Sequence, residues 1–242
     1  MKSLVANAAG LYALEGKMNT ITQTVDEGLR SYLIGVYNKM TTALLVTALT
    51  AWVAAPWVAT LGSFNIVLAF LPLAFVLALN FMDRMSETVA HLVFYLYAAA
   101  TGLSLSSIFL IFTLGSIVQV LLISTSVFAA ASLYGYSTKR DLTSLGGFLF
   151  IGLIGIVVAS VVNLFLGSSM LSWIVSVLAV LIFTGLTAYD TQRLSEEYYS
   201  SGLVYGFSSQ ARSSIFGALT LYLDFINIFI HLLQLLGQRR ED

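Results

Sequence analysis

Long apolar stretches separated by short polar or charged connectors follow one another along most of the chain. Each stretch holds about 20 residues, the length that a helix needs to cross the roughly 30 Å hydrocarbon core of a bilayer. The pattern predicts seven membrane-spanning helices, at residues 40–61, 64–81, 91–112, 117–136, 145–166, 170–189 and 213–237. Because the connectors are short, helices adjacent in sequence are expected to lie antiparallel. The predicted fold is therefore an all-α integral membrane protein, a bundle of seven transmembrane helices.

The two ends of the chain are more polar than the part between them. Residues 1–35 carry six charged side chains among Ser, Thr, Asn and Gly, and the chain ends in QRRED. The weakly apolar run at 3–14 is interrupted and lacks an A-x-A cleavage site, which disfavours a cleaved signal peptide. We predict a polar N-terminal tail over 1–35, a membrane domain over 36–237 and a charged C-terminal tail over 238–242.

Composition indicates that lipid is the solvent. The chain is 58% hydrophobic and 10% charged, with a mean hydropathy of +0.90, whereas soluble domains carry about 25% charged residues. The net charge of −1 and the lack of a basic patch argue against a nucleic-acid partner. With no cysteine, disulfides and thiolate metal sites are excluded. No nucleophile–base motif, HExxH or phosphate-binding loop is present, so we expect no enzyme and no cofactor.

Basic residues collect on alternate connectors. Lys or Arg occurs in the segment before residue 40 and in the connectors after the second, fourth and sixth predicted spans. The other three connectors hold no charged residue. The positive-inside rule therefore predicts a cytoplasmic N-terminus. Arg239 and Arg240 break the pattern at the C-terminus. Either the last helix crosses fully, which we favour because its 25 residues hold no proline, or it is re-entrant.

Two aspartates lie where charge is unfavourable. Asp190 ends the sixth predicted span, and Asp224 lies near the middle of the seventh. An ionised side chain at the bilayer centre costs at least ~2.5–3.5 kcal/mol, and such residues usually face the protein interior and serve a function. If the two side chains meet, they share a proton and titrate as a coupled unit. Alternatively, Asp224 is a neutral carboxyl that supports packing, and Asp190 is a helix-end carboxylate paired with Arg193.

Other polar residues are secondary candidates. Asn227 and His231 follow Asp224 by three and seven residues and share its helix face. For His231, hydrogen bonding within the bundle is expected rather than metal ligation. Asp83 and Arg84 form a charged pair in the second–third connector, where a solvated loop is the simplest interpretation. Arg84 gains interest only if it reaches the two aspartates.

The two aspartates lie in the motifs TAYDTQRL (187–194) and YLDFINIFIHLLQLLG (222–237). Less specific similarity extends over residues 36–48, 101–109 and 135–165. Together these segments resemble the Bax inhibitor-1 family of transmembrane proteins, in its bacterial branch. The resemblance implies a seven-helix bundle with the last helix at its centre. It also implies a bacterial inner-membrane location and a pH-sensitive calcium leak gated by Asp190 and Asp224.

The family resemblance further implies a basic latch after the second helix, which falls on either Asp83 or Arg84 of this sequence. An aspartate at that place could not hold a carboxylate pair as an arginine does. Two carboxylates are also too few for a tight calcium cage, so Asp190 and Asp224 would bind Ca²⁺ only weakly and transiently.

One functional hypothesis and two alternatives follow. In the hypothesis the aspartate pair, sharing a proton or held by Arg84, keeps the last helix closed over a pore for Ca²⁺. The first alternative is a non-transport modulator that binds another membrane protein, such as a membrane quality-control protease, in a stress response through its polar tails. The second is an intramembrane aspartyl protease, although its G-x-G-D motif is replaced by LYLD at 221–224.

Overall fold

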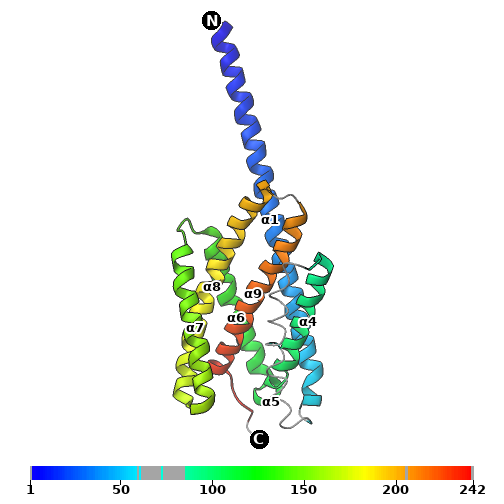
Figure 1. Ribbon diagram of the computed structural model, residues 1–242, viewed down its shortest axis with the longest axis vertical. Coiled ribbons are helices and arrows are strands. Elements are labelled where there is room, and N and C mark those ends of the chain that lie inside the picture. The colour runs from blue at the N-terminus through cyan, green and yellow to red at the C-terminus, as the bar shows by residue number, and fades with distance from the viewer. Residues whose placement is uncertain (1, 59, 61–71, 73–84, 205–206, 241–242) are drawn as a thin grey trace.

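A computed structural model describes residues 2–58, 60, 72, 85–204 and 207–240 of the chain. Its helices are α1 (Lys2–Val58), α4 (Glu87–Leu105), α5 (Ile108–Ile111), α6 (Leu114–Ser137), α7 (Thr143–Leu166), α8 (Ser169–Val204) and α9 (Phe207–Leu236). Within the described residues, the only strand-like pairing is a single bridge between Phe112 and Arg239. The N-terminal end of α1 and the C-terminal end of α9 lie at opposite ends of the molecule (Figure 1).

Six helices of the described part are long and apolar enough to cross a membrane, which confirms the all-helical membrane class. They span residues 26–58, 87–111, 114–137, 143–166, 169–200 and 212–236. Each contains or overlaps one predicted span. The remaining predicted span, 64–81, lies outside the described residues except for Pro72. A count of seven spans is therefore not confirmed.

Helix α9 lies at the centre of the bundle. Each of the six spans contains a strongly apolar stretch. In α9, 67% of the residues of this stretch are buried inside the bundle, whereas the share in the other five helices is between 11% and 39%. It packs against α1, α4, α6 and α8. The Tyr222 hydroxyl is hydrogen-bonded to Thr47 Oγ1 at 2.7 Å, and its ring meets Phe94 and Tyr97 edge-on. Four neighbouring helices therefore fix the helix that carries Asp224.

The last helix crosses the whole bundle without a break. Beyond its C-terminal end, the chain docks on the connection between α5 and α6. The Thr113 N–H donates to the Gln238 carbonyl at 3.0 Å, and the Arg240 N–H donates to the Ile111 carbonyl at 2.9 Å. That connection lies at the opposite end of the bundle from the start of α9 (Figure 1). This path is a full crossing and not a re-entrant segment.

The predicted span 91–112 is interrupted between α4 and α5. The Ser106 Oγ donates to the Leu103 carbonyl at 2.5 Å, and Ser107 is the N-cap of the next short helix, α5. Serine hydroxyls that bond to nearby carbonyls compete with the regular helical pattern. The pattern of apolar residues continues across these serines, so the break could not be read from hydropathy alone.

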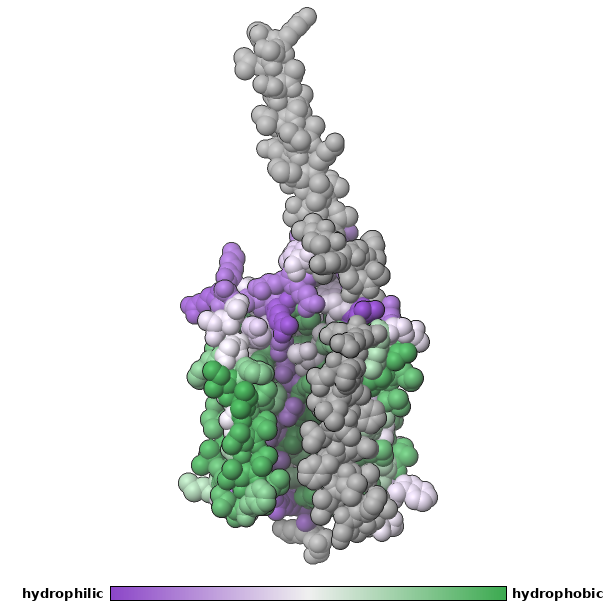
Figure 2. All heavy atoms as spheres, in the orientation of Figure 1, coloured by the Kyte–Doolittle hydropathy of each residue, from purple (hydrophilic) through white to green (hydrophobic). Residues whose placement is uncertain are grey.

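Helices α1 and α8 run beyond their predicted apolar stretches. Helix α8 continues to Val204, well past the predicted end at residue 189. Helix α1 starts at Lys2, and its N-terminal part projects from the bundle (Figure 1). The predicted tail over 1–35 is thus helical from Lys2 and continuous with the first span. Hydrophilic atoms gather at the level where α1 leaves the bundle (Figure 2).

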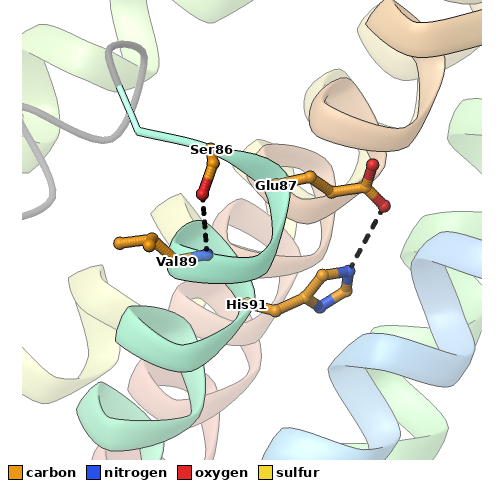
Figure 3. Close-up of polar contacts among 4 residues, drawn as sticks. All are labelled: Ser86, Glu87, Val89 and His91. Carbon is orange, nitrogen blue, oxygen red and sulfur yellow. Dashed lines mark hydrogen bonds and ion pairs between the residues drawn. The ribbon is translucent and has the colours of Figure 1, made fainter.

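The start of α4 is stabilised by local polar contacts (Figure 3). The Val89 N–H donates to Ser86 Oγ at 3.5 Å, and His91 Nε2 lies 4.0 Å from Glu87 Oε1. A serine cap satisfies a free N–H of the first turn, and an acidic residue there complements the helix dipole. These contacts stabilise the first turn of α4 and define where this span begins.

Candidate functional site

Helices α8 and α9 bring the two aspartates to one cavity. Asp190 is 8% exposed and Asp224 is 4% exposed, although they lie 34 residues apart in sequence. Their carboxyl groups are close enough to interact electrostatically. Both line a cavity of about 790 Å³. The structure therefore places together the two acids that the sequence singled out.

Helices α7, α8 and α9 provide most of the described cavity wall, with Tyr97 of α4 and Pro72 completing it. Its polar residues are Tyr97, Tyr189, Asp190, Arg193, Thr220, Asp224 and Asn227. Gly146 of α7 lets the ring of Tyr189 pack closely, because a Cβ there would lie 2.5 Å from that ring. Sequence reasoning did not select Tyr97 or Thr220, since isolated Tyr and Thr residues occur throughout these helices.

One carboxylate oxygen of Asp224 has no partner in the described part of the chain. Its Oδ2 is buried and makes no hydrogen bond there. Burying an unpaired charge is strongly unfavourable, so the ionised form needs water or a cation in the cavity. The packing interpretation of Asp224 expects a hydrogen bond at this atom, and the described residues supply none.

Arg193 lines the same cavity as the two aspartates, and its side chain is exposed. It is close enough to Asp190 to interact electrostatically. Among the described residues, however, the direct ion pair between Arg193 and Asp190 that the alternative interpretation requires is not formed. Arg193 therefore acts on the site through longer-range attraction.

Asn227 and His231 continue the polar face of α9 towards its C-terminal end. Asn227 lines both the main cavity and a second cavity of about 260 Å³, which His231 also lines. His231 Nδ1 lies 3.3 Å from Ser176 Oγ, and Ser176 Oγ donates to Gln234 Oε1 at 2.7 Å. On the face shown in Figure 2, hydrophilic atoms form a narrow line beside a hydrophobic surface. The arrangement provides polar groups along much of the bundle.

The possible latch residues, Asp83 and Arg84, lie outside the described residues. Within the described ranges, no group of three His, Asp or Glu side chains is arranged to hold a metal ion. Among the described residues, a cation in the main cavity would therefore meet two carboxyl groups, together with neutral oxygen atoms.

Gln192 fixes the connection between α6 and α7 against α8. The Leu142 N–H donates to Gln192 Oε1, and Gln192 Nε2 donates to the Arg140 carbonyl, both at 2.8 Å. Asp141 of this connection is fully exposed, and hydrogen bonds with the Thr143 side chain and N–H lower the pKa of its carboxyl group. Asp141 is therefore a charged surface residue that does not line the cavity.

Comparison with known proteins identifies the family. The model of the family described as "Inhibitor of apoptosis-promoting Bax1" matches residues 29–241. The chain belongs to the Bax inhibitor-1 family. The matched part of this Bax inhibitor-1 family member contains both aspartates and every described residue of the cavity wall.

Three bacterial relatives match this Bax inhibitor-1 family member over almost their whole length. Inner membrane protein YbhL of Escherichia coli K12 is 46% identical over 223 residues, covering 88% of this chain and 94% of YbhL. Protein RP147 of Rickettsia prowazekii is 46% identical over 233 residues, covering 90% and 94%. A protein of Caulobacter vibrioides is 38% identical over 245 residues, covering 95% and 97%.

Proposed function

We propose that this Bax inhibitor-1 family protein is a pH-sensitive cation leak for Ca²⁺, gated by Asp190 and Asp224. The observation that carries the proposal is the buried pair of carboxyl groups in one cavity, with one Asp224 oxygen unpartnered among the described residues. Ca²⁺ prefers oxygen ligands and usually takes six to eight of them. Two carboxylates, with no third acidic ligand among the described residues, can attract the ion without retaining it, as a leak requires.

The number of negative charges on the aspartate pair controls whether α8 and α9 stay packed together or separate. When the two carboxyl groups share a proton, a single negative charge is present and α8 and α9 stay packed. Loss of that proton leaves two like charges close together, and the pair responds as one coupled unit. The ionised Asp224 then requires water or a cation, which favours separation of the helices. Opening is therefore expected to increase as pH rises through the range in which the pair loses its proton.

The polar residues beyond the pair extend the proposed path. Asn227 and His231 follow Asp224 along α9, and Arg193 stands at the exposed side of the same cavity. We propose that these groups order water along the path and act as its lining. Arg84 remains the proposed latch that holds the closed state. If Asp83 occupies that place instead, no latch forms, because an aspartate cannot hold a carboxylate pair.

Calcium release from liposomes that contain the purified protein tests this function. We expect release that changes with pH when it is measured from about pH 5 to about pH 8, because two neighbouring carboxyl groups respond to pH as one coupled unit. Protein-free liposomes define the background. Release that equals this background at every pH would contradict the leak and leave the aspartates with a packing role.

Hydration of the cavity gives a separate test, because the natural chain has no cysteine. Asn227→Cys is expected to react with a small charged thiol reagent, since thiolate formation requires water. Val158→Cys is the control, because Val158 is 57% exposed on α7 and lines neither polar cavity. If both variants reacted equally, the cavity would be no more accessible to water than the lipid-facing surface.

We further propose that the N-terminal end is cytoplasmic and that the protein lies in a bacterial inner membrane. The basic connectors support this orientation, and the printed name of the Escherichia coli relative supports the membrane. In intact spheroplasts, an impermeant thiol reagent is expected to label Gly115→Cys, where an added Cβ meets nothing within 4 Å. Lys139→Cys, at the other end of α6, should be labelled only after permeabilisation. The reverse pattern would invert the topology.

The projecting part of α1 supports a second candidate function, the binding of another membrane protein (Figure 1). A membrane quality-control protease in a stress response is the partner that the family suggests. Deleting residues 2–25 is expected to weaken co-purification of such a partner and to leave calcium release intact. Loss of calcium release in this deletion would instead assign the projecting helix to the leak. We expect no peptidase activity, because LYLD stands at 221–224 where G-x-G-D is needed.

A further inference from the structure

A groove between α1 and α6 takes no part in the proposed ion path. It consists of two adjoining cavities of about 410 and 480 Å³, which share Tyr37 and Phe128. Arg30 and Tyr136 line one end of the groove, and Ala51 lines the other. The groove therefore follows α1 over much of its membrane-spanning part.

The deep part of the groove has an apolar floor formed by α9. Phe225, Ile226 and Phe229 line it there, and all three side chains are buried. The hydroxyl groups of Tyr37 and Ser132 are hydrogen-bonded to each other and join α1 to α6 across the groove. A ligand in this part would meet hydrocarbon side chains on three helices.

The length and position of the groove suit an acyl chain. Both walls belong to helices that are long and apolar enough to cross a membrane, which puts the groove at the level of the hydrocarbon region. From Tyr37 to Ala51 the helix rises about 21 Å, at 1.5 Å per residue. One leaflet contributes about half of the roughly 30 Å hydrocarbon core. A single acyl chain can therefore lie in the groove from the interface to the middle of the membrane.

The other end of the groove carries features of a phosphate site at the membrane interface. Arg30 is exposed there and forms no ion pair with any described residue. Tyr136 lies at the end of α6, and Lys139 and Arg140 follow in the next connector. Arginine binds phosphate through paired N–H donors, and tyrosine is enriched at the interface. Basic residues at this level attract anionic lipids.

We propose that this groove binds one anionic phospholipid, with its phosphate at Arg30 and one acyl chain against Phe225 and Phe229. The site is separate from the aspartate cavity and does not depend on the proposed leak. Since Phe225 directly follows Asp224, a bound lipid would support α9 on a different face from the one that bears the carboxyl group. The lipid would thereby help to hold the central helix in place.

Native mass spectrometry of the full chain tests the proposal. The protein is mixed in detergent with equal amounts of dioleoyl phosphatidylglycerol and dioleoyl phosphatidylethanolamine, and the detergent is removed in the spectrometer. We expect one phosphatidylglycerol per chain, severalfold preferred over phosphatidylethanolamine. Ala129→Phe fills the groove and should abolish retention. Ala130→Phe is the matched control, because Ala130 is the next residue and does not line the groove. Thermal unfolding of both variants checks that each is folded.

The headgroup contact is tested by surface substitutions that leave the packing unchanged. Arg30→Gln should remove the preference for phosphatidylglycerol, whereas Arg239→Gln, an exposed arginine at the opposite end of the bundle and outside the groove lining, should keep it. Equal retention by Ala129→Phe and Ala130→Phe would overturn the acyl site. An unchanged preference in Arg30→Gln would overturn the phosphate site. A lipid-free dimer that Ala129→Phe dissociates would assign the groove to a second copy of the chain and overturn the proposal.

Discussion

Replacing Asp224 with asparagine is expected to remove most of the pH dependence of calcium release from liposomes. Asparagine is close in shape to aspartate but cannot ionise, so the second charge that separates α8 and α9 is never formed. An ionised side chain in the membrane differs from a neutral one by at least ~2.5–3.5 kcal/mol. At 1.4 kcal/mol per tenfold change, release at the high-pH end should fall by about 60–300-fold.

Asp190→Asn should change release in the same direction, because the pair responds through both of its members. The double variant should release calcium no more slowly than either single variant, since residues that act as a unit are not additive. Asp141→Asn is the matched control, because Asp141 is exposed at a connector and lines no part of the cavity. If Asp224→Asn kept the parental pH profile, the pair would not be the sensor.

Truncating Tyr222 to alanine is expected to destabilise the whole bundle strongly. The side chain is fully buried at the centre, where α9 meets α1 and α4. Removing a buried aromatic ring costs about 3–5 kcal/mol. Tyr222→Phe keeps the ring and loses the hydrogen bond with Thr47, which should cost about 1 kcal/mol. The midpoint of unfolding in detergent, followed by circular dichroism, measures both effects.

Tyr134→Ala provides the comparison for this prediction. Tyr134 is 49% exposed on α6, so its truncation removes little packing and should change stability by at most about 0.5 kcal/mol. The ranking Tyr222→Ala, Tyr222→Phe, Tyr134→Ala follows from burial. If Tyr222→Ala unfolded at the same midpoint as Tyr134→Ala, α9 would not occupy the centre of the bundle.

The sequence predicted those site residues whose polar side chains conflict with the apolar residues around them. Asp224 stands out because a carboxyl group in an apolar run requires a partner, and Asp190 stands out beside it. Thr220 and Tyr97 line the same cavity but carry no such signal. Their side chains are compatible with lipid, with the helix interface or with a cavity. Only the positions of the neighbouring helices show which of these surrounds them.

The sequence by itself determined the helical class and the approximate bounds of the spans. A bilayer imposes this result, because it fixes the apolar length of a helix and excludes unpaired backbone groups. The tertiary structure alone decided that the helix is interrupted at Ser106 and that α1 and α6 leave a groove between them. The sequence left open whether the last helix is re-entrant, and the structure shows that α9 crosses the bundle. The reason is that lipid-facing and buried helix surfaces are similarly apolar, so close packing and small local hydrogen bonds select the neighbours.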